Sequence, residues 1–144
     1  CRQFLAAFEG YKIQLVLELT ERQLIVPSEM THRIFHELHE LGVFIALDDF
    51  GTGHSSLAYL REFHIDILKI DQSFIRMIGS DALSGHIVDN VIDLAKRLQM
   101  VTVAEGVETP EQAEHLKQYN LDFLQGYLFG RPEDLKIFSD KWLL

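Results

Sequence analysis

Five short apolar runs recur along this chain, and a segment with helical periodicity follows each of them. The runs lie at residues 12–20, 43–50, 65–71, 100–105 and 123–130. No hairpin signal joins one run to the next, so we expect parallel strands linked by right-handed helical crossovers. The pattern therefore predicts an α/β fold. Five units suit either an open doubly wound sheet or most of an eight-stranded barrel, and periodicity alone does not choose between them.

Helix signals fill the segments between the runs. Helices are expected at residues 1–9, 28–41, 56–63, 71–78, 83–98 and 110–119, with a short one near the C-terminus. Ser28 is a candidate N-cap, and Gly42 is a candidate stop for the same helix. We expect Met30, Ile34, Phe35 and Leu38 on the buried face of this helix, and the 12–20 strand to be covered on both faces. No linker divides residues 1–144, which we treat as a single partial domain.

Composition narrows the classes of partner. The 144 residues are 47% hydrophobic and carry a formal net charge of −9. Without a basic stripe, such a surface does not suit polymeric nucleic acid or anionic lipid, whereas a small anionic ligand can bind if cations intervene. The single Cys1 excludes an internal disulfide framework, and no apolar run approaches the roughly 20 residues that cross a bilayer. We expect a cytoplasmic domain, with any membrane tether in segments outside this chain.

Polar side chains fall at or near the carboxyl ends of the predicted strands. In chain order they are Glu18, Asp48, Asp49, Lys69, Glu105, Glu108 and Gln125. Because the strands are predicted to be parallel, their carboxyl ends lie on one face, where such folds build active sites. The sequence therefore predicts one acidic site with a single lysine.

The adjacent pair Asp48 and Asp49 is the centre of this prediction. Alone, an acidic strand end before a glycine turn explains the pair, and Gly51 and Gly53 supply that turn. Side chains alternate along a regular strand, so both carboxylates can face the site only where the pleat ends. Several carboxylates in one pocket repel one another unless divalent cations bind, and oxygen ligands favour Mg²⁺, Mn²⁺ or Ca²⁺. The pattern indicates a hydrolytic site with two ions about 3.5–4 Å apart.

A pair of histidines is a second candidate metal site. His32 and His36 stand four residues apart on the predicted 28–41 helix and could share a metal ion. The sequence shows no carboxylate partner near them, so a solvated helix face is the preferred interpretation.

Five motifs carry a resemblance to a known family. They are Glu18-Leu19-Thr20-Glu21, Asp48-Asp49-Phe50-Gly51-Thr52-Gly53-His54-Ser55-Ser56-Leu57, Leu68-Lys69-Ile70-Asp71, Val103-Ala104-Glu105-Gly106-Val107-Glu108-Thr109 and Gln125-Gly126-Tyr127-Leu128-Phe129-Gly130-Arg131-Pro132. In order and spacing the chain resembles the EAL family of bacterial phosphodiesterases, which cut cyclic di-GMP to linear pGpG on a modified (β/α)₈ barrel. The resemblance implies the same fold, with about five of its βα units in this chain.

The resemblance also implies a role for each matching residue. Metal ligands would be Glu18, Asp48, Asp49 and Glu105, and the cofactors would be two Mg²⁺ or Mn²⁺ ions. Lys69 would hold the attacking water or the developing phosphate charge, while Glu108 and Gln125 would position water. Glu21 would anchor the loop that contains Gly51, Thr52 and Gly53, which in the family couples the site to dimerisation. A homodimer is the expected assembly, and His54 stands where the family often has Tyr.

The resemblance further implies that part of the barrel precedes this chain. The Glu-Ala-Leu motif and an Asn ligand on the following strand are absent from these residues. A barrel of this kind usually has roughly 250 residues, so about 100 are expected before Cys1. We expect the segment to be inactive and poorly soluble alone, and the intact protein to be active.

Two other functions remain as alternatives. One is an inactive EAL domain that binds cyclic di-GMP or a protein partner; the motif expected before Cys1 would discriminate it. The other is a receiver-like phospho-acceptor domain, since an acid pair with a strand-end lysine occurs there too. Glu18, Glu105 and Glu108 supply more acid than such a pocket needs, and labelling by acetyl phosphate would test it.

Overall fold

The computed structural model describes residues 1–7, 13–20, 25–50, 60, 62–77 and 82–142, without the side chains of 82–85 and 87. Its strands are β1 (Val16–Thr20), β2 (Phe44–Phe50), β3 (Ile67–Ile70), β4 (Val101–Ala104) and β5 (Phe123–Leu124). They form one parallel sheet in the order β1-β2-β3-β4-β5. The α/β prediction is confirmed.

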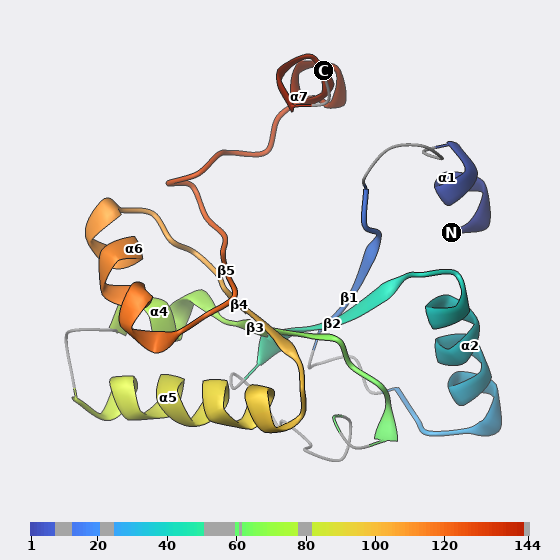
Figure 1. Cartoon of the computed structure of the whole chain (residues 1–144), viewed down its shortest axis with the longest axis horizontal. Coiled ribbons are helices and arrows are strands. Elements are labelled where there is room, and N and C mark those ends of the chain that lie inside the picture. Colours follow the sequence, from blue (N-terminus) through green and yellow to red (C-terminus); the bar gives the residue numbers. More distant parts are fainter. Residues whose placement is uncertain (8–12, 21–24, 51–59, 61, 78–81, 143–144) are drawn as a thin grey trace.

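The strand order also decides between the two candidate architectures. In a doubly wound sheet the chain reverses direction across the sheet, so strands consecutive in sequence are separated at a switch point. Here each strand pairs with the next one in the sequence, from β1 to β5. The sheet is therefore an arc of a (β/α)₈ barrel (Figure 1).

Five helices connect the strands within the described residues: α2 (Glu29–Glu40), α4 (Gln72–Met77), α5 (Ala82–Arg97), α6 (Pro110–Leu116) and the 3₁₀ helix η1 (Lys117–Tyr119). Two more stand at the ends, α1 (Arg2–Ala7) before β1 and α7 (Leu135–Trp142) after β5. In Figure 1, α2 and α5 lie on the same side of the sheet, and an extended segment leads away from β5 to α7. Most of the helix predicted at residues 56–63 lies outside the described residues.

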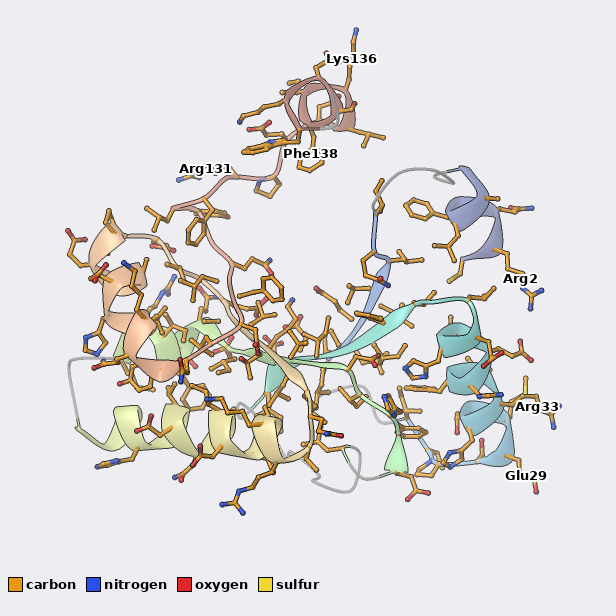
Figure 2. The ribbon with its side chains drawn as sticks, in the orientation of Figure 1. Arg2, Glu29, Arg33, Arg131, Lys136 and Phe138 are labelled. Carbon is orange, nitrogen blue, oxygen red and sulfur yellow. The ribbon has the colours of Figure 1, made fainter. Side chains whose placement is uncertain are left out.

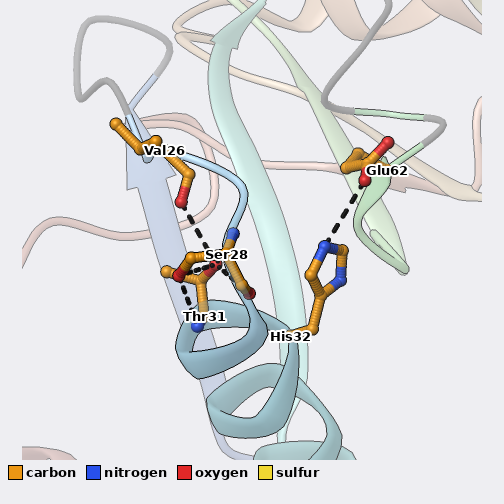
Figure 3. Close-up of polar contacts among 5 residues, drawn as sticks. All are labelled: Val26, Ser28, Thr31, His32 and Glu62. Atoms are coloured by element: carbon orange, nitrogen blue, oxygen red, sulfur yellow. Dashed lines mark hydrogen bonds and ion pairs between the residues drawn. The ribbon is translucent and has the colours of Figure 1, made fainter.

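The predicted ends of α2 are confirmed. Ser28 is the N-cap: its hydroxyl accepts the Thr31 N–H at 3.1 Å, and its own N–H donates to Thr31 Oγ1 at 2.8 Å (Figure 3). After the C-cap, Gly42 has φ +73°, a left-handed conformation that ends helices and favours glycine. These local signals fix where the helix begins and ends.

Three predictions about exposure and partners were wrong. Met30 and Ile34 are exposed on α2, whereas Phe35 and Leu38, predicted on the same face, pack into the core. Leu17 of β1 is exposed too, so that strand is not covered on both faces among the described residues. His32 does have a nearby carboxylate, because its Nε2 lies 3.4 Å from Glu62 Oε1 (Figure 3). Glu62 is distant in sequence, which is why sequence inspection did not find it.

The core lies between the sheet and the outer helices. Ile45 and Leu47 of β2 and Leu68 of β3 pack in one cluster with residues of α2 and α5, including Phe35. A second cluster joins Ile70, Val88, Ile92, Ala104 and Leu116. Because strand residues alternate between faces, Asp48 and Lys69 lie on the opposite face, which in a barrel is the interior.

The apolar side of α7 has no cover within the described residues. Leu135, Ile137, Phe138 and Trp142 are all exposed. Figure 2 shows Phe138 on the side of α7 that faces the sheet and Lys136 on the opposite side. None of the helices described here has the length and apolar character needed to cross a membrane.

Candidate metal centre

A β-bulge brings both adjacent aspartates to the site. Leu47 pairs with Leu68, but the next pair joins Phe50 to Ile70, so β2 carries one more residue than β3 over this interval. The extra step coincides with Asp49, whose φ is +57°, a left-handed conformation that Asp tolerates better than most residues. The strand thus continues to Phe50, and the bulge supplies the break in alternation that the sequence required.

Lys69 joins carboxylates from three different strands. Its Nζ lies 2.8 Å from Glu18 Oε1, 3.4 Å from Asp48 Oδ1 and 2.6 Å from Glu105 Oε1. Glu18 is the middle residue of β1, Asp48 lies in the carboxyl half of β2, and Glu105 directly follows β4. Lys69 is only 4% exposed. A buried ammonium is stable in this place because the carboxylates surround it.

The charges around Lys69 are unbalanced. Burial by itself would lower the pKa of Lys69, but the hydrogen bonds that its ammonium donates to Glu105 and Glu18 outweigh burial and raise that pKa. Burial raises the pKa of Glu105, and the nearby Asp48 carboxylate adds to this effect. One ammonium therefore does not neutralise the acids, and Glu105 retains an increased affinity for a proton.

The carboxylates fit a site for hard divalent cations. Carboxylate oxygens of Asp48, Asp49 and Glu105 lie within 4.8 Å of one another. Oxygen donors of this kind suit Mg²⁺ and Mn²⁺, and added positive charge would relieve the repulsion that Lys69 leaves. Glu18 is not in this group of three, but it is held to the same centre through Lys69.

A pocket of about 350 Å³ adjoins the acids. Its lining residues come from the end of β2 and from the segments that follow β3, β4 and β5: Asp49, Asp71, Gln72, Arg76, Glu105, Gly106, Glu108, Gln125, Gly126 and Tyr127. Both Glu108 and Gln125 thus lie where the sequence placed them. However, the strand predicted at 123–130 was too long: β5 ends at Leu124, so Gln125 follows the strand instead of lying on it.

The backbone fixes the position of Gln125. Its N–H donates to Ala104 O at 2.8 Å, and its carbonyl accepts the Val107 N–H at 3.0 Å. The next residue, Gly126, lies so close to the Val107 backbone that a Cβ there would collide with it. Glycine is therefore required for Gln125 and the Glu105–Glu108 segment to approach each other.

Sequence inspection missed Asp71 and Arg76. Asp71 directly follows β3 and lines the pocket, so its place at the carboxyl end of a strand is the signal that identifies it, although its sequence context also predicts a helix start. Burial would raise the pKa of Asp71, but hydrogen bonds from Ser73 and Gln72 lower it overall. Arg76 Nη2 lies 3.3 Å from Glu108 Oε1, which places a cation beside the pocket. No sequence signal indicated Arg76.

The proposed regulatory loop cannot be placed. Glu21, Gly51, Thr52 and Gly53 lie outside the described residues. Their roles stay predictions.

Comparison with known proteins gives concordant matches. The profile named "EAL domain" matches residues 1–132. "Probable cyclic di-GMP phosphodiesterase PdeN" of Escherichia coli is 49% identical over 142 residues, which are 99% of this chain and 27% of that protein. This chain thus spans about a quarter of that relative's length.

Solved structures agree with the sequence match. The chain titled "PaMucR Phosphodiesterase, c-di-GMP complex" superimposes with a TM-score of 0.75 at 40% identity, covering 86% of this chain and 50% of that one. A manganese/cy-diGMP complex of Klebsiella pneumoniae BlrP1 gives a TM-score of 0.77 at 32% identity, covering 91% and 33%. From the family profile, the relatives and the fold together, this chain belongs to the EAL domain family.

Proposed function

We propose that the intact protein hydrolyses cyclic di-GMP to linear pGpG, and that this chain supplies most of its metal centre. Three findings support the proposal. The relative PdeN is named as a cyclic di-GMP phosphodiesterase, the PaMucR chain was solved in complex with c-di-GMP, and carboxylates converge beside a pocket here. The observation that carries the proposal is the convergence of Asp48, Asp49 and Glu105, two of which also contact Lys69.

The ligand set would hold two Mg²⁺ or Mn²⁺ ions. Asp48, Asp49 and Glu105 would be direct ligands, and Glu18 would join them from β1. Asp48 is the candidate for a shared ligand. When bound, the two ions would activate water near neutral pH and neutralise charge on the phosphate oxygens. BlrP1 was solved as a manganese complex, which agrees with this class of ion.

The residues of this chain would bind and orient the substrate around that centre. Lys69 would donate hydrogen bonds to the attacking water or to the phosphate oxygen on which charge develops, since its raised pKa keeps it protonated. Glu108 and Gln125 would position water at the pocket wall. Arg76, paired with Glu108, would attract the anionic dinucleotide toward the acids.

The second candidate function is cyclic di-GMP binding without hydrolysis. Such a domain has no need of a complete ligand set. The retention of Glu18, Asp48, Asp49, Glu105 and Lys69 in one contact network therefore favours hydrolysis.

Substitution at Asp49 separates the two functions. In the intact protein with Mg²⁺ or Mn²⁺, Asp49→Asn should lower pGpG release by at least about 100-fold, because a ligand and its charge are lost. Glu114→Gln, an exposed change on α6, is the matched control and should keep full activity. Equal turnover by the wild type and the Asp49 variant would reject the proposed centre. Tight cyclic di-GMP binding by a wild type that releases no pGpG would support the binding module.

Location and assembly follow from the same proposal. A cytoplasmic site and an EAL–EAL homodimer are the corresponding expectations, which cell fractionation and analytical ultracentrifugation of the intact protein test.

A further inference from the structure

A second group of metal-ligating side chains lies at the amino end of the sheet, opposite the acidic centre. His39 belongs to the last turn of α2, while His64 and Asp66 lie in the segment that leads into β3. One donor atom from each lies within 4.8 Å of the other two. His39 Nε2 is 3.0 Å from Asp66 Oδ2, and His64 Nε2 is 3.4 Å from Asp66 Oδ1.

Local structure explains how the three residues meet. Ile65 is buried in the core, so its neighbours His64 and Asp66 project to the other side of the chain. His39 lies in the last turn of α2, next to the connection to β2. Its ring contacts that of His64 edge-on, with centroids 5.0 Å apart. The cluster thus joins an outer helix to the start of a barrel strand.

Asp66 has a structural role, but this role does not account for the histidines. Its Oδ2 accepts the Ile45 N–H at 2.7 Å, which ties the start of β3 to β2. Asp122 does the same at the start of β5, where its Oδ2 accepts the Thr102 N–H at 2.8 Å. Asp122 is in no three-ligand group among the described residues, whereas Asp66 has an imidazole nitrogen near each carboxylate oxygen.

The donor distances suit a small transition-metal ion. In a tetrahedral zinc site with bonds of about 2.0–2.2 Å, donor atoms are separated by about 3.3 Å. The two His–Asp distances, 3.0 and 3.4 Å, end on different oxygens of Asp66, and one donor atom from each of the three residues lies within 4.8 Å of the others, so a small side-chain adjustment would bring the donors around one ion. Two imidazoles with one carboxylate favour Zn²⁺ over Mg²⁺, and the Ile45 N–H, which donates to the oxygen nearest His39, holds the carboxylate in place. The carbonyls at the end of α2 add negative potential near His39.

An ion could reach these donors from solvent. His64 is 79% exposed at its side chain and, with Asp66, lines a pocket of about 380 Å³. This opening leaves room for water as a fourth ligand.

We propose that His39, His64 and Asp66 form a binding site for a divalent transition-metal ion of the zinc type, separate from the Mg²⁺ or Mn²⁺ centre at the other end of the sheet. The ion would link α2 to β3 and stabilise the fold in proportion to its concentration. The site uses none of the residues assigned to hydrolysis.

The test is Zn²⁺ titration of the intact protein by calorimetry, in excess Mg²⁺. The wild type should bind one more Zn²⁺ per chain than the His64→Gln variant, or should bind that Zn²⁺ at least about 100-fold more tightly. Zn²⁺ should also raise the melting temperature of the wild type. His64 is exposed, so its replacement leaves the fold intact. Asp66→Asn should show the same loss. His86→Gln, an exposed histidine on α5, and Asp122→Asn, which alters the equivalent strand contact, should bind Zn²⁺ as the wild type does.

Two results would overturn the proposal. One is an identical Zn²⁺ isotherm for the wild type and His64→Gln, which means that the cluster pairs imidazoles with a carboxylate and holds no metal. The other is an equal loss of Zn²⁺ binding in the Asp66→Asn and Asp122→Asn variants with no loss in His64→Gln. That result would mean that Asp66 affects Zn²⁺ binding only through its contact with the sheet.

Discussion

The ammonium of Lys69 lies 2.6 Å from Oε1 of Glu105, and this contact joins β3 to the residue that follows β4 inside the barrel arc. Lys69 is buried and also contacts Glu18 and Asp48. In the metal-free chain it is the cation around which the acids gather. Its removal therefore affects both stability and chemistry.

Replacing Lys69 by Met should destabilise the metal-free protein by about 3–5 kcal/mol at neutral pH, because carboxylates remain without their partner. The pKa of Lys69 is raised, so its stabilising effect is complete below its ordinary value of 10.5 and is not lost near neutrality. Denaturant unfolding measures the change, and Mg²⁺ should recover part of it. Turnover should fall at least about 100-fold even with saturating Mg²⁺. Unchanged stability without metal would mean that the contacts of Lys69 contribute little.

Metal affinity should depend on pH through Glu105. Burial raises the pKa of this carboxyl above its ordinary 4.5, and a divalent cation must displace the proton. Affinity for Mn²⁺ should therefore fall as the pH drops through the raised pKa and level off above it. Folding stability without metal should depend on pH in the opposite direction. The contribution of Glu105 to stability is complete below its ordinary pKa of 4.5 and is lost as the pH rises through its raised pKa. Calorimetry in buffers of different ionisation enthalpy should show proton release on Mn²⁺ binding. A Mn²⁺ affinity that falls on acidification with no proton release over the same pH range would contradict the assignment.

Two substitutions separate the backbone conformation of Asp49 at the bulge from the metal-binding role of its carboxylate. Asp49→Gly and Asp49→Ala both remove the carboxylate, so both should lose Mn²⁺ affinity and activity. They differ in backbone freedom, because φ is +57° at this position. The Gly variant should unfold with a free energy about 1 kcal/mol higher than the Ala variant. Equal stabilities would show that the left-handed conformation costs nothing here.

Gly126 should tolerate no side chain. A Cβ there would collide with the Val107 backbone, which itself is hydrogen-bonded to Gln125. Gly126→Ala should cost about 1–3 kcal/mol of stability and lower activity by displacing Gln125. Gly130→Ala is the matched control, since a Cβ at Gly130 meets nothing within 4 Å, and it should change stability by less than about 0.5 kcal/mol. Similar effects at both glycines would remove the case for close packing at Gly126.

Sequence patterns predicted the fold where the signals were local. The Ser28 cap, the Gly42 stop and the alternation of strands and helices each depend on neighbouring residues, and all three are confirmed. The choice of a barrel over a doubly wound sheet was not available from periodicity. It rests on which strands pair, and pairing is set by contacts between segments far apart in the sequence.

In the candidate site, too, some residues could be predicted from local patterns, whereas others depend on contacts between distant segments. Asp48, Lys69 and Glu105 were found because parallel strands end on one face. The bulge at Asp49, by contrast, depends on the register against β3, and the pairing of Arg76 with Glu108 spans two connections. The exposure of Met30 and Ile34 could not be predicted either, since helical periodicity gives a face without stating what covers it.

Product analysis tests the central claim most directly. The intact protein is incubated with cyclic di-GMP and Mg²⁺, and the nucleotides are separated by chromatography. The proposed function predicts conversion to pGpG that stops on addition of EDTA, resumes with excess Mg²⁺ or Mn²⁺, and is abolished in the Lys69→Met variant. A folded protein that forms no pGpG with either metal ion, or one whose turnover is unaffected by EDTA, would contradict it.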